Sequence, residues 1–344
     1  MYNINVGDNK MKIIKKIGKY IGYAFLSILI VLLLICLWHS ISNVIEKKKI
    51  TIPGDKIEIY DEEFIHSVKM GEGKYTIVLL PGMGTASPYY DYYKLANELS
   101  KNNQVIIYEP LGYGFSDDTS KERTLDNYEY ELSKVLDYYS VKDNIILLGH
   151  SYSGISNMNY ANKHNEVKGI VCLDCTTAYQ IETHVKDGKF IEKVPTTSKI
   201  YTLGSPLGLV RFVFTIDSSI DKELYEDVPE EYIKNYKHLL YNKTLNRTII
   251  NEVDSIYYNQ LELFENKYDE RLYVVSFLSD ETIKEMKEYK KDGDFYHDWE
   301  EMHNLLISNK DKQKIYVLKG NHYIHHGNVD EINNKINEMI NGLE

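Results

Sequence analysis

Cysteine, proline and basic charge are all scarce in this chain of 344 residues. Three cysteines, a small and odd number, exclude a fold held together by a disulfide framework. Seven prolines and 20 glycines exclude a collagen-like or low-complexity chain. The formal net charge is −11, and residues 51–344 alone carry 32 basic and 49 acidic side chains. Because nucleic-acid binding needs a basic surface, we expect no nucleic-acid partner.

Hydrophobic residues make up 43% of the chain, and one long run of them lies near the N-terminus. Residues 20–45 carry no formal charge, and about 20 apolar residues span a bilayer as a helix. A secretory signal peptide would have a shorter apolar region, of about 7–15 residues, followed by a small-residue cleavage site that is missing here. We therefore predict a basic segment over residues 1–19 and an uncleaved, single-pass transmembrane helix over residues 20–45.

Lysines on the two sides of this run indicate its orientation in the membrane. Five lysines precede it, namely Lys10, Lys12, Lys15, Lys16 and Lys19. Four lysines follow it, namely Lys47, Lys48, Lys49 and Lys56. Positively charged flanks tend to stay in the cytoplasm, so the small excess favours a cytoplasmic N-terminus. We expect the rest of the chain, joined by a linker over residues 46–56, to be extracytoplasmic.

The remainder of the chain alternates between strand and helix patterns. This alternation predicts an α/β fold with a mostly parallel sheet that helices cover on both faces. The predicted strands are residues 57–60, 64–69, 75–80, 104–108, 144–148, 167–173, 272–277 and 314–318. The predicted helices are residues 89–100, 124–139, 152–163, 230–240, 248–259 and 329–339.

About 100 residues separate the strand that ends at Leu173 from the strand that starts at Leu272. They show helical patterns and no clear core strand, so we predict a helical cap over residues 178–265, inserted into a core of residues 57–177 and 266–344. Within the cap, the apolar stretch 207–214 is either part of the cap's own core or one wall of an apolar substrate pocket.

The strongest chemical signal is the sequence Gly-His-Ser-Tyr-Ser-Gly at residues 149–154. It follows a buried strand and opens a helix, which is the setting of a nucleophile elbow. Small residues flank such a serine because the turn is sharp. Gly149 meets this requirement, and Ser153 replaces the usual second glycine. We identify Ser151 as the candidate nucleophile.

Two further turns supply the groups that an activated serine needs. Residues 81–84 (Pro-Gly-Met-Gly) follow another buried strand, and the N–H groups of Met83 and Tyr152 are expected to form an oxyanion hole. His322 follows the last strand and is the candidate general base. His325 and His326 lie nearby, but no set of further ligands at zinc spacing accompanies them, and we expect neither a metal nor a cofactor.

These three turns resemble those of the α/β-hydrolase superfamily. Residues 109–116 (EPLGYGFS) strengthen the likeness because they resemble that family's D-x-x-G-x-G-x-S loop. Two departures are Pro81, where the family usually has His, and Glu109, where it usually has Asp. The resemblance implies ester, thioester or amide cleavage through an acyl-enzyme. Dehalogenases and epoxide hydrolases of this fold carry Asp at the position of Ser151, which argues against those reactions.

The acid of the triad has two candidates in the chain order Ser, acid, His. Asp280 follows the strand at the commonest family location, but it comes early after that strand and 41 residues before His322. Asp174 ends the strand 167–173, and some family members place their acid there. We favour Asp174 and keep Asp280 as the alternative. Cys172 and Cys175, which flank Asp174, are interpreted as structural.

The sequence thus predicts a membrane-anchored serine hydrolase that acts on a small-molecule or peptide acyl substrate. The rival class is a non-catalytic binding or sensor module that kept the fold. The presence of both Ser151 and His322 favours an enzyme. Within enzymes, an aminopeptidase, an acyltransferase and a carbon–carbon bond hydrolase remain alternatives.

Overall fold

The computed structural model describes residues 4–186, 189–190, 202, 204–216, 228–244, 246–291 and 297–344. Its centre is an eight-stranded sheet in the order β1-β2-β4-β3-β5-β6-β9-β10. Only the pairs β1–β2 and β2–β4 are antiparallel, and the strands from β4 to β10 are parallel. The strands are β1 (Asp55–Tyr60), β2 (Glu63–Met70), β3 (Thr76–Leu80), β4 (Gln104–Glu109), β5 (Ile145–His150), β6 (Val167–Leu173), β9 (Tyr273–Ser279) and β10 (Gln313–Leu318).

Helices cover both faces of this sheet, as the alternating pattern predicts. The inner strands β3 and β5 are buried along their whole length, which is why they appear as continuous apolar runs. One apolar core lies between the sheet and α4 (Leu125–Tyr138), α5 (Ser153–Lys163), α11 (Asp280–Lys291) and α12 (Trp299–Leu306). The other lies between the sheet and α2 (Pro88–Asp91), α3 (Tyr93–Leu99) and α13 (Val329–Leu343).

The structure differs from the predicted elements in two places. The helix expected over residues 89–100 is divided into α2 and α3 at Tyr92, whose backbone leaves the helical region. The helices α11 and α12 were not predicted, because residues 280–291 are strongly hydrophilic overall and α12 is only eight residues long. Both of these missed helices contribute side chains to the site described below.

The segment between β6 and β9 is helical where the structure describes it. It holds the 3₁₀ helix η1 (Ala178–His184), a small hairpin of β7 (Val185–Lys186) and β8 (Lys189–Phe190), and the helices α7 (Leu209–Ile216), α9 (Glu230–Lys243) and α10 (Arg247–Leu263). Residues 187–188, 191–201, 203, 217–227 and 245 of the predicted cap lie outside the described residues. Within the apolar stretch 207–214, Val210 and Arg211 are buried, whereas Phe212 and Val213 are exposed.

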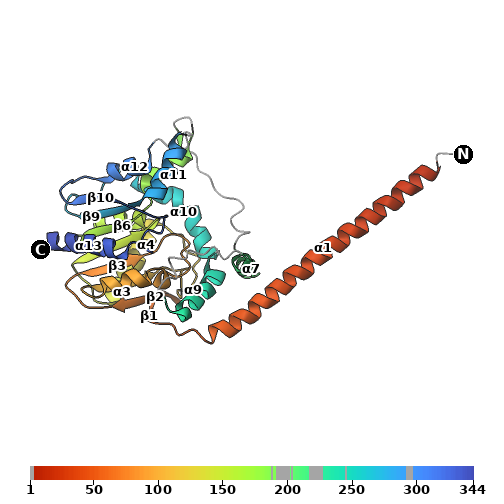
Figure 1. Cartoon of the computed structure of the whole chain (residues 1–344), viewed down its shortest axis with the longest axis horizontal. Helices are drawn as coiled ribbons and strands as arrows, with labels where there is room; N and C mark the ends of the chain where they lie inside the picture. The colour runs from red at the N-terminus through yellow and green to blue at the C-terminus, as the bar shows by residue number, and fades with distance from the viewer. Residues whose placement is uncertain are drawn as a thin grey trace.

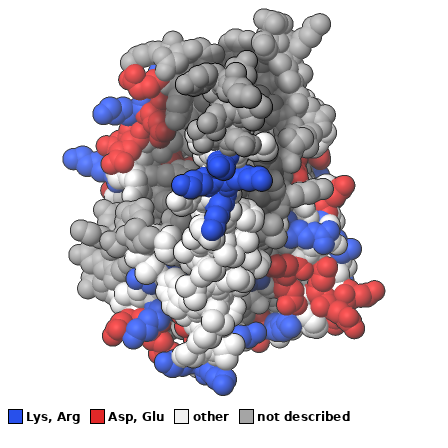
Figure 2. All heavy atoms as spheres, turned by 90° about the vertical axis from the view of Figure 1, so that its right-hand side faces the viewer, with Lys and Arg blue, Asp and Glu red and all other residues white. Residues whose placement is uncertain are grey.

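A single long helix, α1 (Ile4–Lys47), precedes the sheet and stands away from the α/β body (Figure 1). By length and composition its segment Met11–Lys47 is able to cross a membrane. It leaves on the side of the body where α7, α9 and α10 lie. The view from that side shows lysine and arginine side chains at both ends of an uncharged band (Figure 2). Helix α1 thus extends beyond the predicted span of residues 20–45 at both ends.

Candidate active site

Ser151 lies at the carboxyl end of β5, in the sharp turn that leads into α5. Its backbone has φ +50°, in the left-handed region that non-glycine residues rarely adopt. The Ser151 N–H donates to Leu173 O at 3.2 Å, and Ser151 O accepts from Thr176 N at 2.8 Å. The end of β6 and the loop that follows it therefore hold the turn of Ser151. The small residue Ser153 fits as predicted, and its hydroxyl donates to His150 O at 2.9 Å.

The turn that follows β3 lies directly against this serine. Leu80 pairs with Gly149 in the sheet, so both strands end at the same level. A Cβ atom built on Gly82 would come within 3.1 Å of the Ser151 Cβ and 2.6 Å of His150 Nδ1. Only glycine allows this approach of the backbone to the serine. The next residue, Met83, packs against the cluster that contains Tyr152.

Asp174 lies at the carboxyl end of β6 and is completely buried. Its Oδ2 accepts from His322 Nδ1 at 2.7 Å and from the Thr282 hydroxyl at 2.6 Å. Its Oδ1 accepts from the indole Nε1 of Trp299 at 2.7 Å and from the Ser279 N–H at 2.9 Å. Four donors thus satisfy both oxygens of this buried carboxylate.

Asp280, the alternative acid, has a different position. It is the first residue of α11, and its Oδ1 accepts from the Gly320 N–H at 2.9 Å. It therefore fastens the loop that carries His322 without contacting the imidazole. Of the two candidates, the structure brings Asp174 to His322.

His322 lies beside the nucleophile turn. Its ring centroid is 4.6 Å from that of His150, the residue before Ser151, and its carbonyl oxygen accepts from His150 Nε2 at 3.0 Å. His150 is buried, and this burial lowers its pKa well below the ordinary value. A neutral His150 therefore joins the turn of Ser151 to the loop of His322, in agreement with the supporting role that its position suggests.

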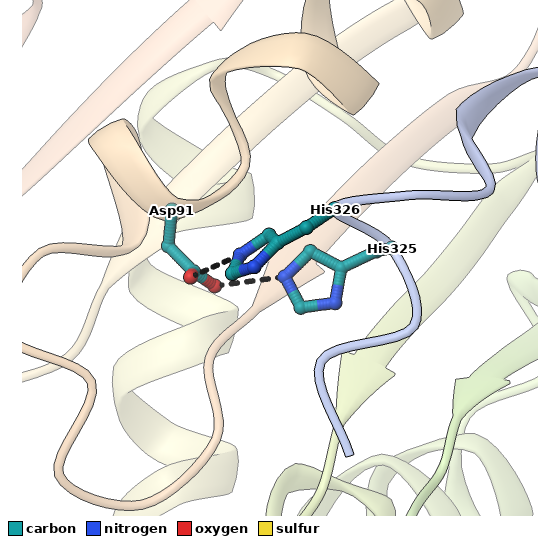
Figure 3. Close-up of side chains that lie close together, drawn as sticks. All are labelled: Asp91, His325 and His326. Carbon is teal, nitrogen blue, oxygen red and sulfur yellow. Dashed lines mark hydrogen bonds and ion pairs between the residues drawn. The ribbon is translucent and has the colours of Figure 1, made fainter. Parts of the chain in front are cut away.

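A second group of side chains anchors the same loop farther along. Each oxygen of the Asp91 carboxylate accepts from one imidazole Nε2 at 3.0 Å, Oδ2 from His325 and Oδ1 from His326 (Figure 3). Burial alone would raise the pKa of Asp91, but the two imidazoles outweigh it and hold this pKa below the ordinary value. Asp91 comes from α2, 234 residues before His325, so the sequence offers no signal for the cluster.

Among the residues that the structure describes, these same three form the group that could hold a metal ion. Their ligand atoms lie within 4.8 Å of one another, and all three side chains are buried. In this arrangement, however, the Nε2 atom of each imidazole is the donor to one oxygen of the ionised Asp91 carboxylate. A metal ligand must instead present a lone pair. The geometry is that of a hydrogen-bonded brace that joins α2 to the His322 loop.

Glu109, one of the two departures from the family pattern, is the centre of another buried network. It accepts from the Ser87 hydroxyl at 2.9 Å, from the Tyr89 N–H at 3.1 Å and from the Phe115 N–H at 2.8 Å. Its fourth partner is His66 Nδ1 at 2.7 Å. The longer glutamate therefore organises the loop after β4 as a structural group.

Helix α10 of the insertion contacts both sides of the predicted oxyanion hole. The Asn259 side chain donates to the Tyr152 hydroxyl at 2.9 Å. The Gly84 N–H donates to the Tyr113 hydroxyl at 3.2 Å. The Tyr113 hydroxyl in turn donates to the buried carboxylate of Glu252. None of these roles was predicted. One available signal was Glu252, a glutamate that lies among apolar residues on the inner side of the predicted helix 248–259.

Cys172 and Cys175 form a disulfide that encloses Asp174 in a four-residue loop. A Cβ atom on Gly154 would lie 2.6 Å from the Cys175 Cβ, so this loop packs closely on the start of α5. The expectation that both cysteines are structural agrees with this position. The third cysteine, Cys36, is free and lies in α1.

The comparisons with known proteins agree with this arrangement. Residues 75–339 match the family described as alpha/beta hydrolase fold. Because this match spans most of the chain, the protein belongs to the alpha/beta-hydrolase-fold family. The resemblance inferred from the three turns is thereby confirmed.

Two curated relatives match parts of the chain. An uncharacterised protein of Bacillus subtilis, YbdG, is 27% identical over 211 residues, which are 61% of this chain and 61% of that protein. A cis-3-alkyl-4-alkyloxetan-2-one decarboxylase of Shewanella oneidensis is 32% identical over 114 residues, which are 32% of this chain and 35% of that enzyme. The chain therefore spans less than two thirds of either relative's length.

Solved structures with the same fold include enzymes of different activities. An esterase of Thermogutta terrifontis superposes with a TM-score of 0.58 at 12% identity and covers 84% of this chain and 98% of its own. An epoxide hydrolase of Vigna radiata superposes with a TM-score of 0.57 at 17% identity. The match covers 84% of this chain and 97% of that enzyme's chain. At these identities the likeness concerns the fold alone.

Proposed function

We propose that this protein is a serine hydrolase that cleaves an ester, thioester or amide through an acyl-enzyme. Ser151 attacks the substrate carbonyl, and His322 Nε2 takes the hydroxyl proton. Asp174 holds His322 Nδ1 as the protonated nitrogen and stabilises the imidazolium that forms. The N–H groups of Met83 and Tyr152 stabilise the negative oxygen of the tetrahedral intermediate.

The observation that carries this proposal is the hydrogen bond of 2.7 Å between buried Asp174 and His322 Nδ1, next to a serine in the left-handed backbone region. A bond at Nδ1 leaves Nε2 free to act on Ser151. Tyr152 also precedes the first turn of α5, where N–H groups have no partner within the helix and the helix dipole favours negative charge.

Two features support an acyl substrate rather than the reactions of other members of the fold. The nucleophile position holds Ser151, whose hydroxyl forms an acyl-enzyme that water can hydrolyse. The oxetan-2-one named for the Shewanella relative is itself a cyclic ester.

We also propose that α1 anchors the protein in a membrane in a single pass, with the hydrolase domain on the extracytoplasmic side. The support is the mean hydropathy of 2.7 over an 18-residue window of this helix and the exposure of its apolar side chains. A helix with apolar residues exposed on nearly every side is stable in lipid and costly in water.

A serine-directed fluorophosphonate probe tests the catalytic proposal on the full-length protein in detergent. We expect covalent labelling of the wild type and none of Ser151→Ala. Ser156→Ala, on the first turns of the same helix, is the matched control and should label like the wild type. Absence of labelling in folded wild type, or equal labelling of Ser151→Ala, would contradict the proposal and favour a non-catalytic binding module.

A further inference from the structure

The last turns of α1 carry one stripe of side chains that faces the cap. Ile35 and His39 are buried, and Asn43 and Glu46 are partly buried, at the spacing of one helix face. Most of the other apolar side chains at this level are exposed, among them Leu33, Leu34, Leu37 and Ile41. Helix α1 therefore docks on the protein by one face and leaves its remaining surface free.

The main partner of this stripe is Arg211, the only charged residue of α7 and itself 4% exposed. Two side chains of α9 also bind it, His238 to Glu46 and Asn242 to Asn43. Its guanidinium donates to both oxygens of Glu46, at 2.6 and 2.7 Å, and to Asn43 Oδ1 at 2.7 Å. Its Nε donates to His39 Nδ1 at 3.1 Å. A buried guanidinium needs such partners, and its planar fork matches a carboxylate. This Arg211–Glu46 clamp fastens α7 to the anchor helix.

The two helices also approach each other closely. A Cβ atom on Gly208 would lie 2.5 Å from the Cβ of His39, and Gly208 has φ +74°. Glycine is thus required at the point where α7 begins. This contact also fixes the level of α7 along α1, opposite His39.

That level falls inside the apolar run of α1. At a rise of about 1.5 Å per residue, the uncharged residues 20–45 extend over about 39 Å, and His39 lies about 9 Å before their end. A hydrocarbon layer of about 30 Å centred on this run would end about 5 Å beyond His39. Amphipathic helices in the membrane interface lie at such depths, about 5–10 Å into the boundary of headgroups and acyl chains.

The side of α7 that does not bind α1 is apolar and exposed. Phe212 is 40% exposed and Val213 is 56% exposed, and Leu207 just before the helix is 40% exposed. Gly208 and Arg211 place α7 beside His39, so these side chains lie near the level of the exposed apolar side chains of α1. Exposure of such an apolar patch to water is unfavourable in free energy, whereas its transfer into lipid is favourable.

We propose that α7 lies in the interface of the membrane that α1 spans, with Leu207, Phe212 and Val213 toward the acyl chains. The cap then has its own contact with the bilayer, and the Arg211–Glu46 clamp keeps α7 at the correct depth. This inference rests on the proposed membrane span of α1 and not on the proposed chemistry of Ser151. It gives residues 207–214 a role as a membrane contact, besides the two alternatives that the sequence offered.

A lipid-quenching experiment on the full chain tests this proposal. Single cysteines are placed in a Cys36→Ser background at Val213→Cys, at Leu33→Cys in the span, and at Val317→Cys, a half-exposed position on edge strand β10. Each variant is labelled with an environment-sensitive fluorophore and reconstituted into phosphatidylcholine nanodiscs with or without doxyl-labelled lipid. We expect the labels at 213 and 33 to have blue-shifted emission and at least twofold quenching, and the label at 317 to show neither.

Three results would overturn the proposal. The first is a label at 213 that behaves like the label at 317 while the label at 33 is quenched, which would leave the anchor intact and place α7 in water. The second is a blue shift at 213 without doxyl quenching, which would indicate that protein, such as a second copy, covers the face. The third is no quenching at 33, which would remove the span itself. Labelling of Ser151 by the fluorophosphonate reports separately on the proposed chemistry.

The clamp is tested in the same background with Glu46→Gln. We expect doxyl quenching at position 213 to fall at least twofold while quenching at position 33 is unchanged. Glu230→Gln, which removes an exposed carboxylate from α9 that pairs with Lys234, is the matched control and should change neither. Unchanged quenching at position 213 in Glu46→Gln would overturn the role of the clamp.

Discussion

At the scale of single residues, the proposed chemistry depends on how Asp174 is held. Its four hydrogen bonds come from His322, Thr282, Trp299 and the Ser279 backbone. Because the other three donors fix both oxygens, the carboxylate has one orientation, and so does the imidazole bound to it. A carboxylate in this position keeps Nε2 of the neutral histidine unprotonated, as a general base requires.

The first prediction concerns this carboxylate. Asp174→Asn places an amide beside His322 Nδ1 and favours the wrong tautomer, so we expect kcat for an ester substrate to fall by about 10³- to 10⁴-fold with little change in the unfolding temperature. Steady-state kinetics and thermal unfolding of the full-length protein provide the check. Asp280→Asn keeps an oxygen for the Gly320 N–H and is the matched control, expected within about twofold of the wild type. Equal activity of Asp174→Asn and the wild type would remove Asp174 from the triad.

At the scale of elements, α10 connects the insertion to the predicted oxyanion hole. It contacts the nucleophile side through Asn259 and Tyr152, and the β3 turn through Glu252, Tyr113 and Gly84. Burial raises the pKa of Glu252, and the hydroxyls of Tyr113 and Tyr128 both bind this carboxylate. A helix of the insertion therefore positions backbone N–H groups that belong to the core.

A pair of tyrosine variants separates this positioning role from a purely structural one. Tyr113→Phe removes the hydroxyl that accepts from the Gly84 N–H, and we expect kcat to fall about 5- to 10-fold. One hydrogen bond contributes about 1 kcal/mol, and about 1.4 kcal/mol corresponds to a tenfold change in rate. Tyr128→Phe removes a hydroxyl from the same carboxylate but not from Gly84, and we expect it to lose similar stability with kcat near the wild type. Equal kcat values for the two variants would show that the link to Gly84 has no catalytic effect.

At the scale of the whole molecule, several buried imidazoles make the fold sensitive to acid. Burial lowers the pKa of His150 well below its ordinary value and also lowers the pKa of His325. In the unfolded chain these groups take up a proton near pH 6.5. Below that pH the unfolded state binds more protons than the native state, so the free energy of unfolding decreases as the pH falls.

The corresponding prediction uses His150→Gln, which keeps a donor for His322 O and removes the titrating group. For the wild type we expect the unfolding free energy to fall below pH 6.5 by about 1.4 kcal/mol per pH unit for each such histidine. In the variant we expect the unfolding free energy to decrease less steeply with falling pH, because one titrating histidine is missing. Thermal unfolding midpoints at pH 7.5, 6.5 and 5.5 measure this difference. Parallel curves for the two proteins would contradict it.

Comparison of the predicted and observed elements shows where sequence patterns are informative. All eight strands of the main sheet were predicted to within a few residues, because each is a short apolar run bounded by turn residues. The regular helices α4, α5 and α13 were predicted for a similar reason, their apolar spacing. By contrast, α11 is highly charged and α12 is only eight residues long, so their apolar residues were too few to indicate a helix, although α12 begins with a capping box of Asp298 and Glu301.

The sequence by itself determined the family, the proposed nucleophile and the proposed base, because these depend on short local patterns in which a strand, a turn and a helix follow one another. It also determined the long apolar helix, because hydropathy is a local property. Only the tertiary structure decided which carboxylate reaches His322, which side chains hold that carboxylate, and that Arg211 binds the anchor helix. Each of these contacts is between residues more than 100 positions apart in the sequence. Such contacts exist only once the chain has folded and brought the distant segments together.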